Sequence, residues 1–196
     1  MAEGPGTRAS LLVRLRDPQD RDAWRQFVAL YAPLIHGLAR RRGLQDADAA
    51  DLTQEVLRVL SKDGAFVYDP ARGSFRGWLY TVTSRKILDF RASRAQRERG
   101  SGDTVTQQFL EEAPAPEDDA ERWEREYQRH LFALAADAVK HAFAPATWQA
   151  FWLLAVEGKS AEETAATVNL SVGAVYVAKS RVLAKLKKQI EILETE

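Results

Sequence analysis

Apolar residues recur at intervals of three and four along most of the 196-residue chain, the spacing that gathers side chains on one face of an α-helix. This periodicity predicts a series of helices, over residues 8–17, 20–42, 46–62, 74–99, 121–143 and 146–157. Two further helices are expected between residues 160 and 190. No segment shows the alternation of apolar and polar residues that a half-buried strand would have. The pattern therefore predicts an all-α fold.

One stretch interrupts the helical pattern. Residues 100–120 are rich in glycine, serine, proline and acidic residues and contain few apolar side chains, which is the composition of a flexible linker. The sequence therefore predicts two helical domains, residues 8–99 and 123–192, joined by a flexible acidic linker over residues 100–122.

Residues 160–190 carry helix caps and a cationic second helix. Ser160 and Glu163 have the spacing of a capping box. Asn169 tolerates the left-handed conformation that can end the first helix, and Ser171 can cap the second. The second helix is expected to bury an aliphatic stripe, made of Val172, Val175, Val182, Leu183, Leu186 and Ile190. This is the pattern of a helix-turn-helix that enters a DNA major groove, and an ordinary helical hairpin with a solvated basic face is the alternative.

The predicted recognition helix turns other side chains away from that stripe, namely Gly173, Ala174, Val177, Ser180, Arg181 and Ala184. Arg181 can bond guanine through two hydrogen bonds, and Val177 or Ala174 can meet a thymine methyl group. Lys187 and Lys188 are expected to contact phosphate.

The net charge of zero hides an uneven distribution of charge along the chain. Residues 1–99 contain 18 Lys and Arg against 12 Asp and Glu, whereas residues 100–126 contain 2 against 9. Residues 127–196 contain 8 against 7. A basic block, an acidic connector and a locally basic end suggest two modules that touch a polyanion, joined by a segment that does not.

The predicted helix over residues 74–99 holds most of the basic block, in Arg76, Arg85, Lys86, Arg91, Arg94, Arg97 and Arg99. Such a row can neutralise phosphates. The loop before it carries Phe66 and Tyr68, and aromatic side chains stack on unpaired bases. This combination suits a DNA strand that has been melted, although both aromatic residues could instead belong to the core.

The predicted helix over residues 46–62 has one polar face, formed by Asp51, Gln54, Glu55 and Arg58. Leu52, Val56 and Val59 are expected to lie opposite that face, and Leu57 is expected to be exposed at its edge. A solvated face explains these residues as well as a protein-binding surface does.

Composition excludes several classes of function. The absence of cysteine excludes disulfides and thiolate metal sites, and the three histidines have no metal-ligand spacing. Helix capping explains Asp46, Asp48 and Asp51 better than a metal site does. No glycine-rich phosphate loop or catalytic constellation is present, so we expect neither an enzyme nor a cofactor. A polar N-terminus and the lack of a long apolar run predict a soluble cytoplasmic protein without a membrane segment.

Four short motifs, taken together and in order, resemble a known family. Residues 51–56, DLTQEV, are similar to the D-L-x-Q-E-V of extracytoplasmic-function sigma factors, and residues 75–79, FRGWL, are similar to F-R-x-W-L. Residues 157–165, EGKSAEETA, resemble E-G-x-S-x-x-E-I-A, and residues 170–175, LSVGAV, resemble I-S-x-G-T-V. The resemblance covers residues 8–95 and 125–190.

The resemblance implies a sigma factor, with a region 2 that binds core RNA polymerase and melts the promoter −10 element and a region 4 that binds the −35 element. It implies as partners promoter DNA and the clamp helices and flap of the polymerase. Many members of this family are also held off by an anti-sigma factor, although no residue of this chain indicates one. On the polymerase-binding helix it points to Asp51, Gln54, Glu55, Leu57 and Arg58. For the −10 element it points to Tyr68, Arg76, Trp78, Arg85, Lys86, Arg91 and Arg94. For the −35 element it points to Ser171, Gly173, Ala174, Tyr176, Val177, Ser180, Arg181, Lys187 and Lys188.

The chain departs from the family pattern at three places. Arg85 stands where the family has Asn, and Asn169 stands where it has Gly. The tripeptide KSR, residues 179–181, comes three residues later than usual. If the shifted tripeptide keeps its role in the family, Arg181 reads a base. If the helix is instead aligned with the family without a gap, the base contacts fall at Ala174, Tyr176 and Val177.

Two other functions fit parts of the chain. A helix-turn-helix regulator that is no subunit of the polymerase would need only residues 125–190. It would leave unexplained the polar face of the helix over 46–62 and the arginine-rich helix. A helical adaptor protein would leave the basic row unexplained.

Overall fold

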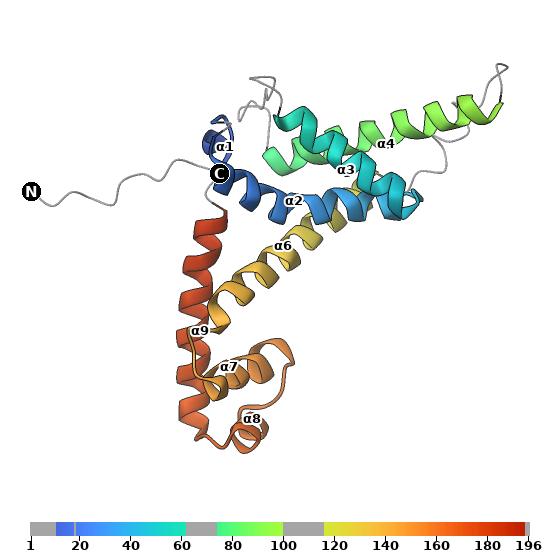
Figure 1. The fold of residues 1–196 in the computed structure, drawn as a ribbon. Helices are drawn as coiled ribbons and strands as arrows, with labels where there is room; N and C mark the ends of the chain where they lie inside the picture. The colour runs from blue at the N-terminus through green and yellow to red at the C-terminus, as the bar shows by residue number, and fades with distance from the viewer. Residues whose placement is uncertain (1–10, 18, 62–73, 100–115, 195–196) are drawn as a thin grey trace, which may run out of the picture. The chain divides into compact units, whose positions relative to one another are not determined.

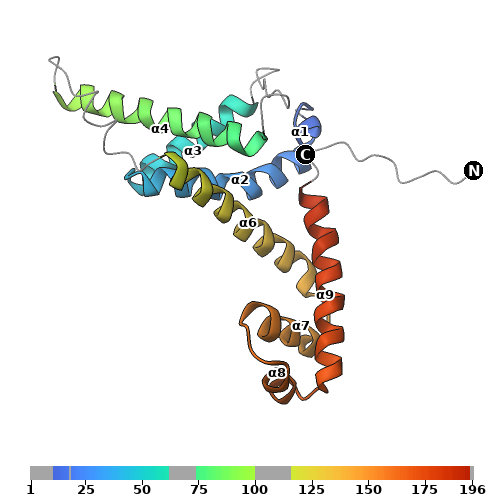
Figure 2. The same ribbon diagram turned by 180° about the vertical axis from the view of Figure 1, so that it is seen from behind.

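The computed structural model describes residues 11–17, 19–61, 74–99 and 116–194 (Figures 1 and 2). Its helices are α1 (Leu11–Arg14), α2 (Arg21–Arg41), α3 (Asp46–Ser61), α4 (Phe75–Arg99), α6 (Pro116–Lys140), α7 (Pro145–Phe151), the π-helical turn η2 (Trp152–Val156), α8 (Ala161–Val168) and α9 (Val172–Leu193). No strand occurs in the described ranges, which confirms the all-α prediction. None of the helices within these ranges is long and apolar enough to cross a membrane.

The chain divides into two compact units, Ala9–Gln128 and Arg129–Glu196. In the first unit, α2 packs against α3 and α4 around a cluster of aromatic rings. The ring centroid of Tyr31 lies 4.7 Å from that of Phe27 and 5.4 Å from that of Phe75, and all three side chains are buried. The apolar spacing along α2 therefore serves as the core-facing stripe that the sequence predicts.

Hydrogen bonds at the helix starts follow the local signals in the sequence. The Ser74 hydroxyl accepts from the Gly77 N–H over 3.1 Å. The Ser160 hydroxyl accepts from the Glu163 N–H over 3.1 Å, and the Glu163 carboxylate accepts from the Ser160 N–H, which completes the capping box. Asn169 ends α8 in the left-handed conformation at φ 54°. The capping box and the left-handed Asn169 are confirmed as predicted.

The acidic connector differs from its prediction. Residues 100–115 lie outside the described residues, but residues 116–122 are helical and begin α6. Asp119 is buried within the first unit, as are Trp123 and Tyr127. The first unit therefore extends to Gln128, because the acidic residues there have basic partners on α2 and α4.

In the second unit, α7, α8 and α9 pack together with the end of α6 (Figure 1). One apolar cluster joins Val139, Phe151, Val182 and Leu186, and a second joins Ala150, Ala165, Val175 and Ala178. The helix predicted over 146–157 changes to a π-helical turn after Phe151.

Several predicted core positions are exposed instead, namely Val59, Val172 and Leu183. On α9 the reason is Ala178, which is 4% exposed. Its small side chain allows close packing in the cluster with Ala150 and Ala165, so the buried face of α9 is centred nearer Ala178 than the valine and leucine spacing suggests.

Candidate functional site

The outer face of α3 carries four exposed polar side chains, Asp51, Gln54, Glu55 and Arg58, which we call the α3 polar face. Leu52 and Val56 lie on the opposite side and are 2% and 0% exposed. Two apolar residues border the polar face on its two edges. Val59 is 37% exposed, and Leu57 is half-buried rather than exposed as predicted.

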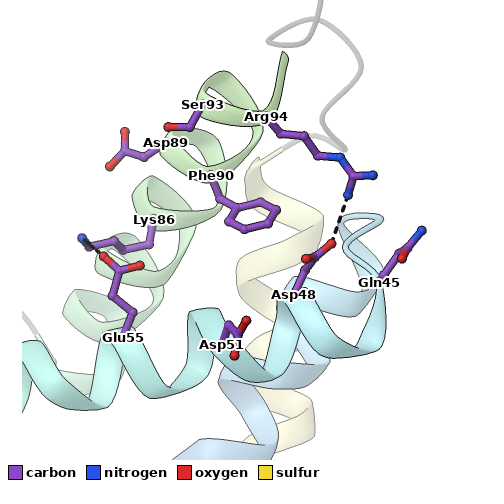
Figure 3. Close-up of a pocket in the computed structure, with 9 residues that line it drawn as sticks. All are labelled: Gln45, Asp48, Asp51, Glu55, Lys86, Asp89, Phe90, Ser93 and Arg94. Carbon is purple, nitrogen blue, oxygen red and sulfur yellow. Dashed lines mark hydrogen bonds and ion pairs between the residues drawn. The ribbon is translucent and has the colours of Figure 1, made fainter. Parts of the chain in front are cut away.

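A polar groove of about 650 Å³ lies between α3 and α4 (Figure 3). It is lined by Gln45, Asp48, Asp51, Glu55, Lys86, Asp89, Phe90, Ser93 and Arg94. Two ion pairs cross it: Lys86 Nζ lies 2.6 Å from Glu55 Oε1, and Arg94 donates to Asp48 over 3.1 Å. The groove is thus lined by Asp51 and Glu55, which are expected to bind polymerase. It is also lined by Lys86 and Arg94, which are expected to bind DNA.

The cations of α4 do not form one continuous face. Lys86 and Arg94 turn toward α3, whereas Arg76 and Arg91 turn toward α6 and α2. Arg85 is exposed and has no ion pair within the described part of the chain. The α4 cations whose side chains are described therefore do not share one face of the helix, and their binding to DNA stays a prediction.

Arg76 and Arg91 are both engaged inside the first unit. Arg76 donates to Glu124 over 3.1 Å, and its guanidinium lies 4.4 Å from the ring centroid of Tyr127. Arg91 donates to the backbone carbonyl of Arg42. These bonds occupy the guanidinium groups that the sequence assigns to DNA.

The remaining aromatic residues expected at the −10 site have different positions. Trp78 is half-buried, and its ring centroid lies 5.6 Å from that of Phe75. Phe66 and Tyr68 fall outside the described residues.

Acidic side chains of α6 form hydrogen bonds with basic side chains at the end of α2 and on α4. The sequence did not predict these contacts. Arg42 donates to Asp119 over 3.0 Å and to the Tyr80 hydroxyl over 3.0 Å. Arg41 donates to Glu126 over 2.5 Å. One signal was available: Trp123 and Tyr127 recur at an interval of four at the start of the helix predicted over 121–143, which indicates that this end of the helix has a buried face.

The helix-turn-helix in the second unit is built from α8 and α9. Ala165 of α8 packs in one cluster with Val175 and Ala178 of α9, where small side chains let the two helices approach closely. Ser171 begins α9, and its hydroxyl accepts from the Ala174 N–H over 3.2 Å. That hydroxyl caps α9, and the expected contact of Ser171 with the −35 element stays a prediction.

Most of the residues expected to contact the −35 element are exposed on α9, namely Gly173, Tyr176, Val177, Ser180, Arg181, Lys187 and Lys188. Ala174 is half-buried. Lys179, which lies about one helical turn from both Val175 and Val182 of the predicted stripe, is also half-buried. The first two turns of the exposed face are apolar, and the cations follow farther along the helix.

Known proteins resemble this chain over most of its length. Residues 27–97 match the family described as sigma-70 region 2. The ECF RNA polymerase sigma factor SigD of Mycobacterium bovis is 31% identical over 199 residues, which cover 94% of this chain and 85% of SigD. The ECF RNA polymerase sigma factor SigE of Mycolicibacterium smegmatis is 30% identical over 154 residues, which cover 78% of this chain and 56% of SigE. The structure of CnrH in complex with the cytosolic domain of CnrY aligns with 93% of this chain and 96% of that chain, at 20% identity and a TM-score of 0.34.

Proposed function

The chain belongs to the extracytoplasmic-function sigma factors of the sigma-70 family, which direct RNA polymerase to promoters, and we propose that its two units divide this task between them. The first unit binds core polymerase and the −10 element, and the second binds the −35 element. The observation that carries this division is the capped helix-turn-helix of the second unit, whose α9 presents an exposed face without acidic residues between Val172 and Lys188.

On the first unit, the α3 polar face docks on the clamp helices of the polymerase. Gln54 lies at its centre, and Asp51 and Arg58 flank it with both signs of charge. Leu57 and Val59 add apolar area at the edges, so the face combines hydrogen-bonding groups with a modest apolar border. The similarity of residues 27–97 to sigma-70 region 2, which includes α3, favours docking over a merely solvated face.

For the −10 element, Arg85 is, among the α4 cations whose side chains the structure describes, the one that is ready to meet phosphate. Lys86 and Arg94 line the groove, where they pair with the carboxylates of Glu55 and Asp48 on α3. When DNA binds there, phosphate oxygens replace these carboxylates as partners of the two cations.

Arg76 and Arg91 would have to leave their partners within the first unit. We therefore assign strand binding first to Arg85, Lys86 and Arg94, with Tyr68 and Trp78 as the candidate stacking residues.

For the −35 element, α9 enters the major groove. Arg181 is exposed and reads a base, and Lys187 and Lys188 hold phosphates. Contact of the second unit with the polymerase flap completes the polymerase interface. The catalytic chemistry of transcription belongs to the polymerase, with which this protein acts in the cytoplasm. An anti-sigma factor is the further partner that family membership suggests.

A regulator outside the polymerase is the weaker function. It would use the second unit alone, whereas the similarity to sigma-70 region 2 lies in residues 27–97 of the first unit.

Reconstitution with core polymerase tests the proposal. The full chain should co-purify with core enzyme and should direct transcription from a specific set of promoters. Promoter-specific DNA binding without association with core enzyme would instead indicate a separate regulator.

A further inference from the structure

Two apolar side chains protrude together from the start of α9. Tyr176 is 54% exposed and Val177 is 56% exposed, and both belong to the first two turns of the helix. Next to them, a Cβ placed on Gly173 would meet nothing within 4 Å. Single exposed apolar residues are common on protein surfaces, but here two adjoin each other on the helix that faces DNA.

The packing of α9 fixes the direction of these two side chains. Val175 and Ala178, which bracket them in sequence, are 0% and 4% exposed and pack with Ala165 of α8. Successive residues of a helix are turned by about 100°, so residues 176 and 177 must point outward while 175 and 178 point inward. Rotating α9 to bury Val177 would expose Val175, and the pair is therefore held in its outward position.

The charged residues around Tyr176 and Val177 indicate which kind of ligand this surface binds. Residues 172–188 include five cations and no acidic residue: Lys179, Arg181, Lys185, Lys187 and Lys188. Such a surface suits a polyanion. An apolar pair embedded in it also needs an apolar feature on that polyanion. In the major groove that feature is the C5-methyl group of thymine.

The chemistry of the Val177 side chain limits which bases it can recognise. Its side chain has neither a donor nor an acceptor, so it cannot make the two hydrogen bonds by which guanine or adenine is read. Gly173 leaves open space beside the pair, so no neighbouring side chain holds the helix away from the base edges.

We propose that Tyr176 and Val177 determine specificity at the −35 element by contacting the methyl groups of thymines at neighbouring base pairs. The inference rests on the proposed role of α9 in −35 binding. Arg181 lies one turn beyond Val177 and faces the adjoining part of the element. Sequence preference then has two sources along α9, methyl contact in the first two turns and hydrogen bonding beyond them.

Replacing thymine by deoxyuridine in the DNA tests the proposal, because this change removes the methyl group and keeps the hydrogen-bonding pattern. The preferred −35 sequence is first selected from random DNA by the full chain bound to core polymerase. Each thymine in it is then replaced in turn, and binding is measured for the wild type, Val177→Ala and Tyr176→Ala. Ile192→Ala is the matched control, since Ile192 is also an exposed apolar residue of α9 but lies near its end.

In the wild type and in Ile192→Ala, we expect deoxyuridine to weaken binding at one or two positions. The loss should be roughly fourfold for each methyl group, corresponding to about 0.8 kcal/mol. In Val177→Ala or Tyr176→Ala, the loss at one of these positions should disappear.

Three results would contradict the proposal. If deoxyuridine is harmless at every position, or equally harmful in all four proteins, a −35 element exists but Tyr176 and Val177 do not read its methyl groups. If the selected element contains no thymine opposite α9, the inference fails in the same way. If selection yields no −35 element at all, the proposed function of α9 fails and the inference fails with it.

Discussion

The guanidinium Nε of Arg42 donates to Oδ2 of Asp119 over 3.0 Å, although the two residues are 77 positions apart in the sequence. Both side chains are only 8% exposed. A second nitrogen of Arg42 donates to the Tyr80 hydroxyl, so this one guanidinium connects α2, α4 and α6 within the first unit. Residues 119–128 are thereby part of the first unit.

Removing one partner of this buried pair should destabilise the first unit strongly. We expect Asp119→Ala to lower the free energy of unfolding by about 3 kcal/mol, because it leaves the Arg42 charge buried without its carboxylate. The control Glu121→Ala removes a carboxylate that is 74% exposed and should change stability by less than about 0.5 kcal/mol. The double variant Arg42→Met/Asp119→Leu should recover most of the loss. Urea unfolding measures all three, and equal stabilities for Asp119→Ala and Glu121→Ala would contradict the prediction.

Gln54→Ala should weaken binding to core polymerase by about 1–3 kcal/mol, as loss of a central interface residue does. The melting temperature should hardly change, because Gln54 is exposed on α3. Gln19→Ala removes another exposed glutamine of the same unit away from α3 and should bind normally. The affinities of the wild type, Gln54→Ala and Gln19→Ala for core polymerase are compared by titration of labelled core enzyme. Wild-type affinity for Gln54→Ala would exclude the α3 polar face as the centre of the interface.

Limited proteolysis should distinguish the two parts of the acidic connector. The composition of residues 100–115 predicts early cleavage there. Residues 119–127 should resist cleavage, because Asp119, Trp123 and Tyr127 are buried in the first unit. Mass spectrometry of the first fragments locates the cut. An initial cut between residues 119 and 127 would show that this half of α6 does not stay packed in the first unit in solution.

The two kinds of cation on α9 should respond differently to substitution. Arg181→Ala should cost about 1–3 kcal/mol and relax the preference at one base pair. Lys188→Ala should weaken binding evenly across sequences and lower the slope of log affinity against log salt by about one. Selection of binding sites and salt titrations with each variant provide the comparison. An unchanged preferred sequence for Arg181→Ala, with a changed one for Tyr176→Ala, would place base reading entirely in the first two turns of α9.

The ion pair between α1 and the start of α2 predicts a pH effect with a definite sign. The Arg14 guanidinium, at 2.9 and 3.0 Å, and the Ala23 N–H both bond Asp20 and lower the pKa of its carboxyl. This contribution to stability is therefore present above the unfolded pKa, about 3.9, and is lost as the pH falls through the lower folded pKa.

NMR titration of the Asp20 carboxyl measures that shift. In Arg14→Ala the pKa of Asp20 should rise toward its ordinary value. The pKa of Asp137, which Lys140 lowers in the second unit, should stay where it is and serves as the control. An unchanged pKa of Asp20 in Arg14→Ala would show that Arg14 is not the main cause of the shift.

The sequence by itself determined the helices, their caps and the motifs of the family. The capping box of Ser160 and Glu163, the left-handed Asn169 and the cap at Ser171 all involve atoms within about one helical turn of each other, so local sequence specifies them. The polar face of α3 followed from helical periodicity for the same reason.

Only the tertiary structure decided how the charged residues are used. The sequence presents the cations of α4 as one row and residues 100–122 as a linker. In the structure Arg76 pairs with Glu124 and Arg42 pairs with Asp119, whereas Arg85 stays exposed. Likewise, the close packing of Ala178 with Ala165 turned Leu183 outward. These outcomes depend on side chains from different helices that approach one another only after folding, which neither periodicity nor composition along a single segment can specify.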